Sequence, residues 1–200
     1  EGGYWIAGVR YGIDLYRVGQ HAQAVTLLAM GAEEGYELAQ ANAAYMFEHR
    51  MGYSLPDADE LALRLYERAA LQSVDHYFAL GNLMLKMEQN GKPTTAEAGP
   101  VTGVGQAMGY LEAAAELGNV QALRKLAEMY EEGVEGVVVK NTQRALSFYK
   151  RLLSVIGGEK GSGSGSVGSS SWGSMMDITK LQWKVTSLSA RTGLASVFGG

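Results

Sequence analysis

The sequence contains no cysteine and only three prolines in its 200 residues. Without cysteine, a disulfide framework, a thiol nucleophile and every thiolate metal site are excluded. No apolar run approaches the length of about 18 residues that a membrane-spanning helix needs, so direct membrane insertion is not expected. The first residues lack the basic flank and apolar stretch of a signal peptide, and we therefore expect no targeting signal.

Positive charge is also scarce. The chain has 17 Lys and Arg against 21 Asp and Glu, which gives a net charge of −4 at pH 7. The basic residues do not gather with aromatic residues into a stripe, so nucleic acid is not expected as a partner. The chain is instead 46% hydrophobic and 19% charged, which is the composition of a folded protein and excludes wholesale disorder.

Glycine is abundant but unevenly spread. Residues 157–174 contain seven glycines and seven serines and show no apolar periodicity. Such a segment cannot offset its chain entropy by burial, and its regular Gly-Ser alternation resembles an engineered flexible linker. Residues 1–156 carry a net charge of −6, and residues 157–200 carry +2. We therefore predict an acidic body over 1–156, a linker over 157–174, and a tethered, partner-derived peptide over 175–200.

The body has the pattern of a helical repeat, because apolar residues recur at spacings of three and four and no alternating run predicts a strand. One motif, of the type Ala-x-x-x-Leu-Ala-x-x-Tyr, begins at Ala7, Ala39, His76 and Ala122. A second motif, of the type Leu-Tyr-Glu-Arg-Ala-Ala, begins at Leu27, Leu65, Tyr110 and Phe148. The predicted fold is therefore all-α, an α/α-solenoid of about four helix–turn–helix units in which neighbours cover each other's apolar stripes.

The third unit is longer than the others. Its two motifs are about eight residues further apart than those of the second and fourth units, and the extra residues fall between Asn90 and Gly105. This stretch holds two of the three prolines, which predicts an exposed loop.

The fourth unit, with Ala122, Leu126, Ala127, Tyr130 and Gly133 in order, resembles the Sel-1-like repeat, a relative of the tetratricopeptide repeat. Residues 34–46 also resemble the start of the C-terminal repeat block of the lumenal adaptor of Hrd-type ubiquitin ligases. This second resemblance implies a role in ER-associated degradation, a place in the ER lumen, and a component of the ligase complex as partner. Without it, the expected compartment is the cytoplasm.

No catalytic, metal or cofactor site is expected. The three histidines, His21, His49 and His76, fall in three different units, and none has a partner ligand four residues away. His76 occupies a position equivalent to Ala39, which predicts a packing role. The Glu-rich stretches around Glu131 and Glu135 lack the spacing of a calcium loop and are typical of a solvated face. The protein is therefore predicted not to be an enzyme.

A peptide-binding surface can be placed by helical angle. Tyr45 and Asn42 point away from the packed side of their helix, at 240° and 300° when Ala39 is set to zero. The family expectation is that the first helix of each pair lines the concave side of the solenoid. The hypothesis for the binding strip is therefore a mixed polar and apolar set: Ile13, Asn42, Tyr45, Asn82, Lys125 and Glu128. Tyr45 is equally well explained as a packed aromatic residue.

The segment after the linker has two interpretations. As a helix it places four aliphatic residues on one face, and as a strand it alternates and also uses Trp183. The helix, lying in a groove of the solenoid, is favoured because an all-helical body offers no sheet edge. The predicted anchors of the tethered peptide are Ile178, Leu181, Trp183, Val185 and Leu188.

The first functional hypothesis is a non-catalytic adaptor that binds a short segment of a partner protein. The segment 175–200 represents that partner, and the linker permits binding in cis or to a neighbouring molecule. The alternatives are a structural or self-assembling solenoid whose C-terminal segment is a tag, and a regulatory subunit of an enzyme complex.

Overall fold

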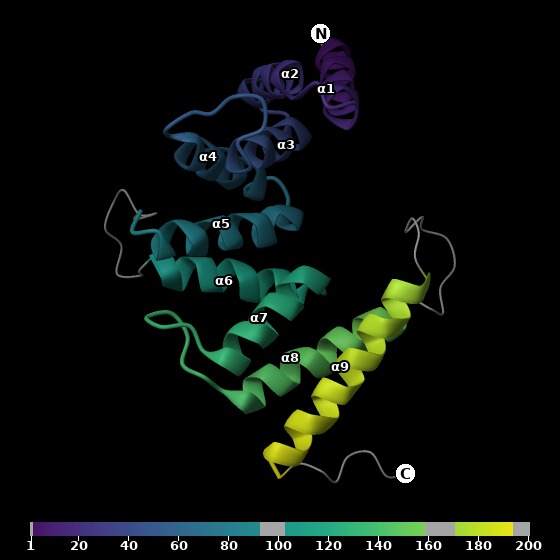
Figure 1. Ribbon diagram of the computed structural model, residues 1–200. Coiled ribbons are helices and arrows are strands. Elements are labelled where there is room, and N and C mark those ends of the chain that lie inside the picture. Colours follow the sequence, from purple (N-terminus) through teal and green to yellow (C-terminus); the bar gives the residue numbers. More distant parts are fainter. Residues whose placement is uncertain (1, 93–102, 159–170, 194–200) are drawn as a thin grey trace. The chain divides into compact units, whose positions relative to one another are not determined.

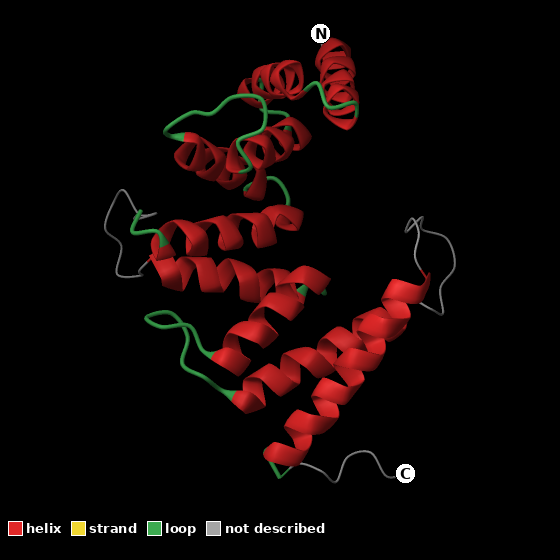
Figure 2. Cartoon of the chain, in the orientation of Figure 1, coloured by secondary structure: helices red, strands yellow, loops and turns green. Residues whose placement is uncertain are grey.

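The computed structural model describes residues 2–92, 103–158 and 171–193. These residues form helices joined by turns and loops (Figure 2). The β-type pairing found among them is an isolated bridge between Val134 and Val138. The predicted all-α fold is therefore confirmed for the described part of the chain.

The predicted helix pairs are present (Figure 1). The copies of the two sequence motifs lie on the expected members of the pairs, except that the copy beginning at His76 starts in the 3-10 turn before α5. The pairs are α1 (Gly2–Arg17) with α2 (His21–Glu33), α3 (Glu37–Glu48) with α4 (Ala58–Ala70), α5 (Tyr77–Gln89) with α6 (Gly103–Glu116), and α7 (Val120–Glu132) with α8 (Thr142–Gly158). A short 3-10 turn, η1 (Val74–His76), precedes α5, and a further helix, α9 (Ser171–Arg191), follows α8.

The chain divides into two compact units, residues 1–111 and 112–200, and the boundary lies within α6. In the first unit α1 packs on α2, α2 on α3, α3 on α4, and α4 on α5. In the second unit α7 packs on α8, and α9 packs on α8. Each unit is thus a stack in which a helix is covered by the next one along the chain, as expected of a repeat solenoid.

Two predicted boundaries differ from the structure. Helix α6 begins at Gly103, so the loop predicted up to Gly105 ends earlier, and residues 93–102 lie outside the described residues. Helix α8 extends to Gly158 and α9 begins at Ser171, so the predicted linker 157–174 is helical at both ends. Its middle, residues 159–170, lies outside the described residues. Helix continuation needs only backbone hydrogen bonds, which glycine and serine also make.

Helix α7 shows how the sequence sets the local structure. The Asn119 side chain accepts a hydrogen bond of 2.9 Å from the backbone N–H of Ala122, which caps the N-terminus of the helix. At the other end Gly133 takes a φ of 77°, a conformation that ends the helix and that other residues rarely adopt. Between these signals the buried side chains follow the helical period: Ala122, Leu123, Leu126, Ala127, Met129 and Tyr130.

Small residues bring the helices close together, as the repeat pattern predicts. A Cβ atom placed on Gly81 of α5 would lie 2.8 Å from the backbone oxygen of Ala107 in α6 and 3.1 Å from Leu111 Cγ. The same addition on Gly109 of α6 would meet nothing within 4 Å. Gly81 is therefore required by packing, whereas Gly109 is not.

A buried carboxylate fixes the turn between α3 and α4. Arg50, with a positive φ of 52°, donates two hydrogen bonds of 3.1 Å to the two carboxylate oxygens of Asp59. Lys92 Nζ lies 3.2 Å from Asp59 Oδ2. The Asp59 side chain is only 8% exposed, and its hydrogen bond from Arg50 lowers the pKa of the carboxyl below its ordinary value. The network ties the unusual backbone at Arg50 to the first turn of α4.

Replacing Gly81 with alanine is expected to destabilise the protein by about 1–3 kcal/mol, because the new methyl group clashes with a backbone atom of α6 that cannot rotate away. The matched variant Gly109→Ala is expected to stabilise by about 0.5–1 kcal/mol through helix propensity alone. Urea unfolding followed by circular dichroism measures both. Equal shifts for the two variants would contradict the close approach of α5 and α6.

Replacing Asp59 with asparagine is expected to lower the free energy of unfolding by about 1–2 kcal/mol at pH 7. The value is modest because the Arg50 side chain is partly exposed to solvent. Because the pKa of Asp59 is lower in the folded state, its contribution is present above the ordinary carboxyl pKa and is lost as the pH falls through the lowered value. The difference in the free energy of unfolding between wild type and variant should therefore become smaller as the pH falls from 5 to 2. Urea unfolding at several pH values measures this difference, and a constant difference would exclude the carboxylate as its source.

Candidate helix-binding face

The face formed by α7 and α8 is occupied by α9. Helices α8 and α9 lie side by side, with α9 running back along α8 (Figure 1). Leu181, Val185 and Leu188 of α9 are buried, with exposed fractions of 5%, 1% and 3%. Their spacing of four and three places them on one side of the helix. Each fully buried side chain of this kind contributes about 1.5–3 kcal/mol, so the aliphatic contact is the main attraction between α9 and this face.

A polar cluster lies at the edge of this aliphatic contact. Lys184 Nζ of α9 lies 2.8 Å from Glu131 Oε2 of α7 and 5.0 Å from the ring centroid of Tyr149 in α8. The hydroxyl of Tyr149 donates a hydrogen bond of 2.8 Å to the same Glu131 oxygen. One carboxylate oxygen thus receives a hydroxyl from α8 and an ammonium group from α9, which joins the three helices.

The environment of this cluster changes the pKa of its groups. Burial is the largest cause that raises the pKa of Tyr149, to about 12, and the hydrogen bond to Glu131 adds to it. Burial alone would lower the pKa of Lys184, but hydrogen bonds to Glu131 and Tyr149 outweigh it and hold that pKa above its ordinary value. At neutral pH the cluster therefore contains a neutral tyrosine and a charged lysine.

The same three residue types recur in the first unit. Tyr66 of α4 donates a hydrogen bond of 3.3 Å to Glu48 of α3, and Lys86 of α5 lies 3.6 Å from that carboxylate. In both copies the tyrosine follows the glutamate by 18 residues. In both copies, too, the lysine comes from the next helix of the stack. The contact of α9 with α7 and α8 therefore uses the same three residue types as the contact of α5 with α3 and α4, although Lys86 faces the other carboxylate oxygen of Glu48.

The residues of the predicted peptide-binding strip lie in both compact units. Asn42 donates a hydrogen bond of 2.7 Å to the backbone oxygen of Leu38, one turn back in its own helix. Tyr45 is 40% exposed and stacks on His49 at 4.1 Å, with Tyr16 edge-on at 6.3 Å. The remaining strip residues lie partly or fully at the surface of their units, with Ile13, Asn82 and Lys125 half-buried and Glu128 exposed. The strip remains a prediction.

The predicted anchors of the C-terminal segment fall into two groups. Leu181, Val185 and Leu188 are buried on the α8 side, and Ile178 is half-buried one turn earlier. Trp183, by contrast, is 72% exposed. The segment is helical, and in a helix residue 183 lies on the side away from the other anchors.

Two other sequence interpretations need correction. Glu131 was expected on a solvated face, but its side chain is only 22% exposed and pairs with α8 and α9. His76 packs as expected, yet its Nε2 also lies 2.6 Å from Glu37 Oε1 of α3. The signal that identifies Glu131 is its spacing of 18 residues to Tyr149, repeated at Glu48 and Tyr66 and at Glu112 and Tyr130. In the third pair the cation on the tyrosine is Arg144.

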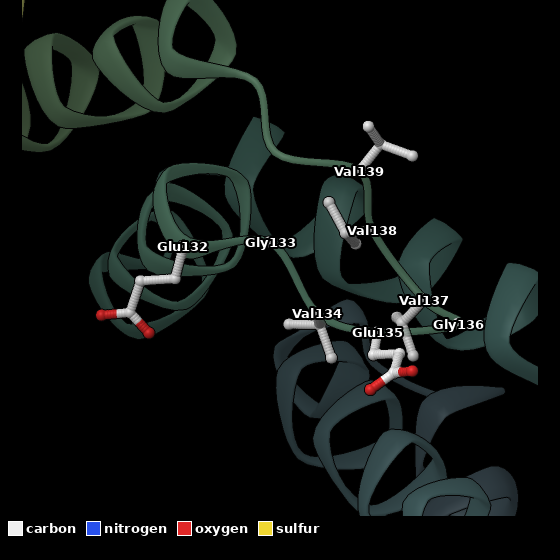
Figure 3. A pocket seen from close by; sticks show the side chains of 8 residues that line it. All are labelled: Glu132, Gly133, Val134, Glu135, Gly136, Val137, Val138 and Val139. Carbon is white, nitrogen blue, oxygen red and sulfur yellow. The ribbon is translucent and has the colours of Figure 1, made fainter.

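A hollow in the connection from α7 to α8 belongs to a single loop. Residues 132–139 line about 550 Å³ between α7 and α8 (Figure 3). Val134 and Val138 exchange two backbone hydrogen bonds of 2.8 Å, which close the loop on itself. The polar side chains on its lining are Glu132 and Glu135, both exposed. The loop is therefore a tight connection between two helices and brings no functional groups together.

Within the described residues, no group of three or more histidine, aspartate or glutamate side chains is placed to hold a metal ion. None of the helices in the described ranges is long and apolar enough to cross a bilayer. Helix α9 meets the α7–α8 face through aliphatic side chains bordered by one charged pair.

The fold and this face define an α/α-solenoid of helical hairpins. The Sel1 repeat family matches residues 37–74, 104–119 and 120–153. The first match covers the hairpin of α3 and α4, and the other two cover most of α6, α7 and α8. These segments of the chain are therefore similar to the Sel1 repeat. No curated protein matches the sequence significantly.

Two solved structures show the same fold. One is c5321, described as a protective antigen of uropathogenic Escherichia coli that displays an SLR fold, with 22% identity and a TM-score of 0.61. The other is a Sel1 repeat protein from Oxalobacter formigenes, with 25% identity and a TM-score of 0.54. The similarity covers 94% and 74% of this chain, but only 34% and 54% of those proteins. Repeats of this type generally act as scaffolds for protein–protein interaction.

Replacing Tyr149 with phenylalanine tests the polar cluster at alkaline pH. The pKa of Tyr149 is raised from 10 to about 12, so its contribution to stability is complete below pH 10 and is lost as the pH rises towards 12. The variant should lose less stability than wild type between pH 9 and pH 11.5, measured by urea unfolding. The control Tyr11→Phe removes an exposed tyrosine and should follow the wild-type curve. Identical pH dependence in all three proteins would contradict the buried position of the hydroxyl.

Proposed function

We propose that this protein is a non-catalytic adaptor whose α7–α8 face binds a helix of a partner protein. The observation that carries the proposal is α9 itself, which buries three aliphatic side chains on that face and places Lys184 on Glu131. Because α5 pairs a lysine with a glutamate and a tyrosine of the preceding hairpin in a similar way, a helix fits this face better than an extended peptide.

The role of α9 follows from the predicted organisation of the chain. On this proposal, residues 1–156 are the adaptor, 157–174 a linker, and 175–200 a segment derived from the partner. The solenoid then binds this segment in cis or on a neighbouring molecule. In its native setting it would bind the same segment on a separate partner protein. The alternative is a structural or self-assembling solenoid whose C-terminal segment is a tag. The burial of one face of α9 favours a segment with a defined place on the stack over a tag.

We further propose the ER lumen and ER-associated degradation as the setting, with a component of an Hrd-type ubiquitin ligase complex as the partner. Support comes from the resemblance of residues 34–46 to the lumenal adaptor of such ligases. In the structure these residues form the turn before α3 and most of α3. Helix α3 packs mainly on α2 and α4 within the repeat stack.

Cutting the chain within residues 159–170, at an introduced protease site, tests whether α9 binds as a ligand. The two fragments are expected to stay together in size-exclusion chromatography, because the aliphatic face of α9 holds them without the covalent connection. Leu181→Asp should separate them, since it places a charge at a buried position. The matched control Gln182→Asp changes an exposed neighbour and should leave them together. Separation of the unmodified fragments, with no recombination on mixing, would refute the adaptor proposal.

A further inference from the structure

Glu131 and Tyr149 together form the site that receives one cation of α9. The Tyr149 hydroxyl donates to the same Glu131 oxygen that faces Lys184, so α8 holds this carboxylate as well as α9. With α9 in place, Tyr149 is 1% exposed and the Glu131 side chain is 22% exposed. A carboxylate buried to this degree needs a positive partner, because an unpaired charge there would be poorly solvated.

The cation that fits the site is an ammonium group. Lys184 Nζ lies 2.8 Å from Glu131 Oε2 and, at the same time, 5.0 Å from the Tyr149 ring centroid. A compact charge on a flexible stem satisfies a carboxylate and an aromatic face together. The other lysine of α9 within the described residues, Lys180, is exposed and one turn away from this position.

The position of the lysine between the anchors is the same in the two copies of the contact. In α9 the order is Leu181-x-x-Lys184-Val185, with both aliphatic residues buried. In α5 the order is Leu83-x-x-Lys86-Met87, again with both apolar residues buried. Two helices that are far apart in sequence thus present the same pattern to the same pair of residue types.

We infer that Glu131 and Tyr149 select the partner of the α7–α8 face, and that this partner is an amphipathic helix of the pattern aliphatic-x-x-Lys-aliphatic-x-x-aliphatic. The inference rests on the proposed function and adds to it the chemistry of the ligand. The aliphatic residues supply the attraction, and the lysine fixes which helix binds and in which register. A helix with the aliphatic face but an acidic residue at the lysine position is rejected, since it would bring two carboxylates together.

The test uses the full chain with its own α9 disabled by Leu181→Asp and Val185→Asp, and synthetic fluorescein-labelled peptides of residues 171–193 as the probe. Fluorescence anisotropy measures binding. The Lys184→Met peptide is expected to bind about five- to tenfold more weakly than the unmodified peptide. The Lys180→Met peptide, which removes an exposed lysine from the same helix, should bind within about twofold of it.

A charge exchange makes the test specific. The Lys184→Glu peptide should bind the unmodified face at least tenfold more weakly, and should recover when the receptor chain carries Glu131→Lys. Affinities that are independent of residue 184 would overturn the inference while leaving the adaptor proposal intact. Failure of the unmodified peptide to bind would instead overturn the adaptor proposal and the inference with it.

A second measurement avoids the disabled receptor. In the otherwise unmodified full chain, Lys184→Met should lower the hydrogen-exchange protection of the α9 amides by about the same factor, and Lys180→Met should not. Equal protection in the two variants would overturn the inference even if the doubly substituted receptor failed to fold.

Discussion

The structure depends on one constraint: a helical hairpin cannot bury its own apolar stripe and must be covered by the next helix. Along the first unit this cover is supplied in order, by α3 on α2 and by α5 on α4. In the second unit α8 packs on α7, and α9 covers α8 in turn. Leu146, Tyr149 and Leu152 of α8 are buried in this arrangement. The burial of Leu181, Val185 and Leu188 therefore has two roles. It covers the last hairpin of the stack, and it holds α9 as a ligand.

Aliphatic contact alone would leave the position of each covering helix poorly defined, because a shift of one turn, about 5.4 Å, brings similar side chains into contact. The polar clusters remove this freedom. A carboxylate held by a tyrosine accepts a lysine at one register only, at Glu48 for α5 and at Glu131 for α9. A further cluster joins the first two hairpins, where the buried Gln40 donates to the backbone oxygen of Ala32 and accepts from Gln72. Each of these seams thus combines an apolar attraction with a polar contact that sets its position.

The sequence was sufficient for the helices and their pairing, since the apolar period and the two recurring motifs place every anchor on the correct helix. It was not sufficient for the site. Glu131 lies among other glutamates, and only the position of Tyr149, 18 residues away and on another helix, distinguishes it from its solvated neighbours. Which face of α9 is buried could be inferred from its aliphatic spacing. That α9 covers α8 could not, because the contact depends on how a hairpin stack ends in space.

The two faces of α9 explain why one helix can serve both as cover and as ligand. Its inner face is mainly aliphatic and includes the buried Ser189, whereas Gln182 and Thr186 on another side are exposed. A helix that was apolar all round would cover α8 but would itself need cover, and the stack would continue or aggregate. Trp183, 72% exposed, is the exception to this polar outer face. Any partner helix that replaces α9 must have the same asymmetry. The lysine at the border between the two faces is the residue that marks where the inner face ends.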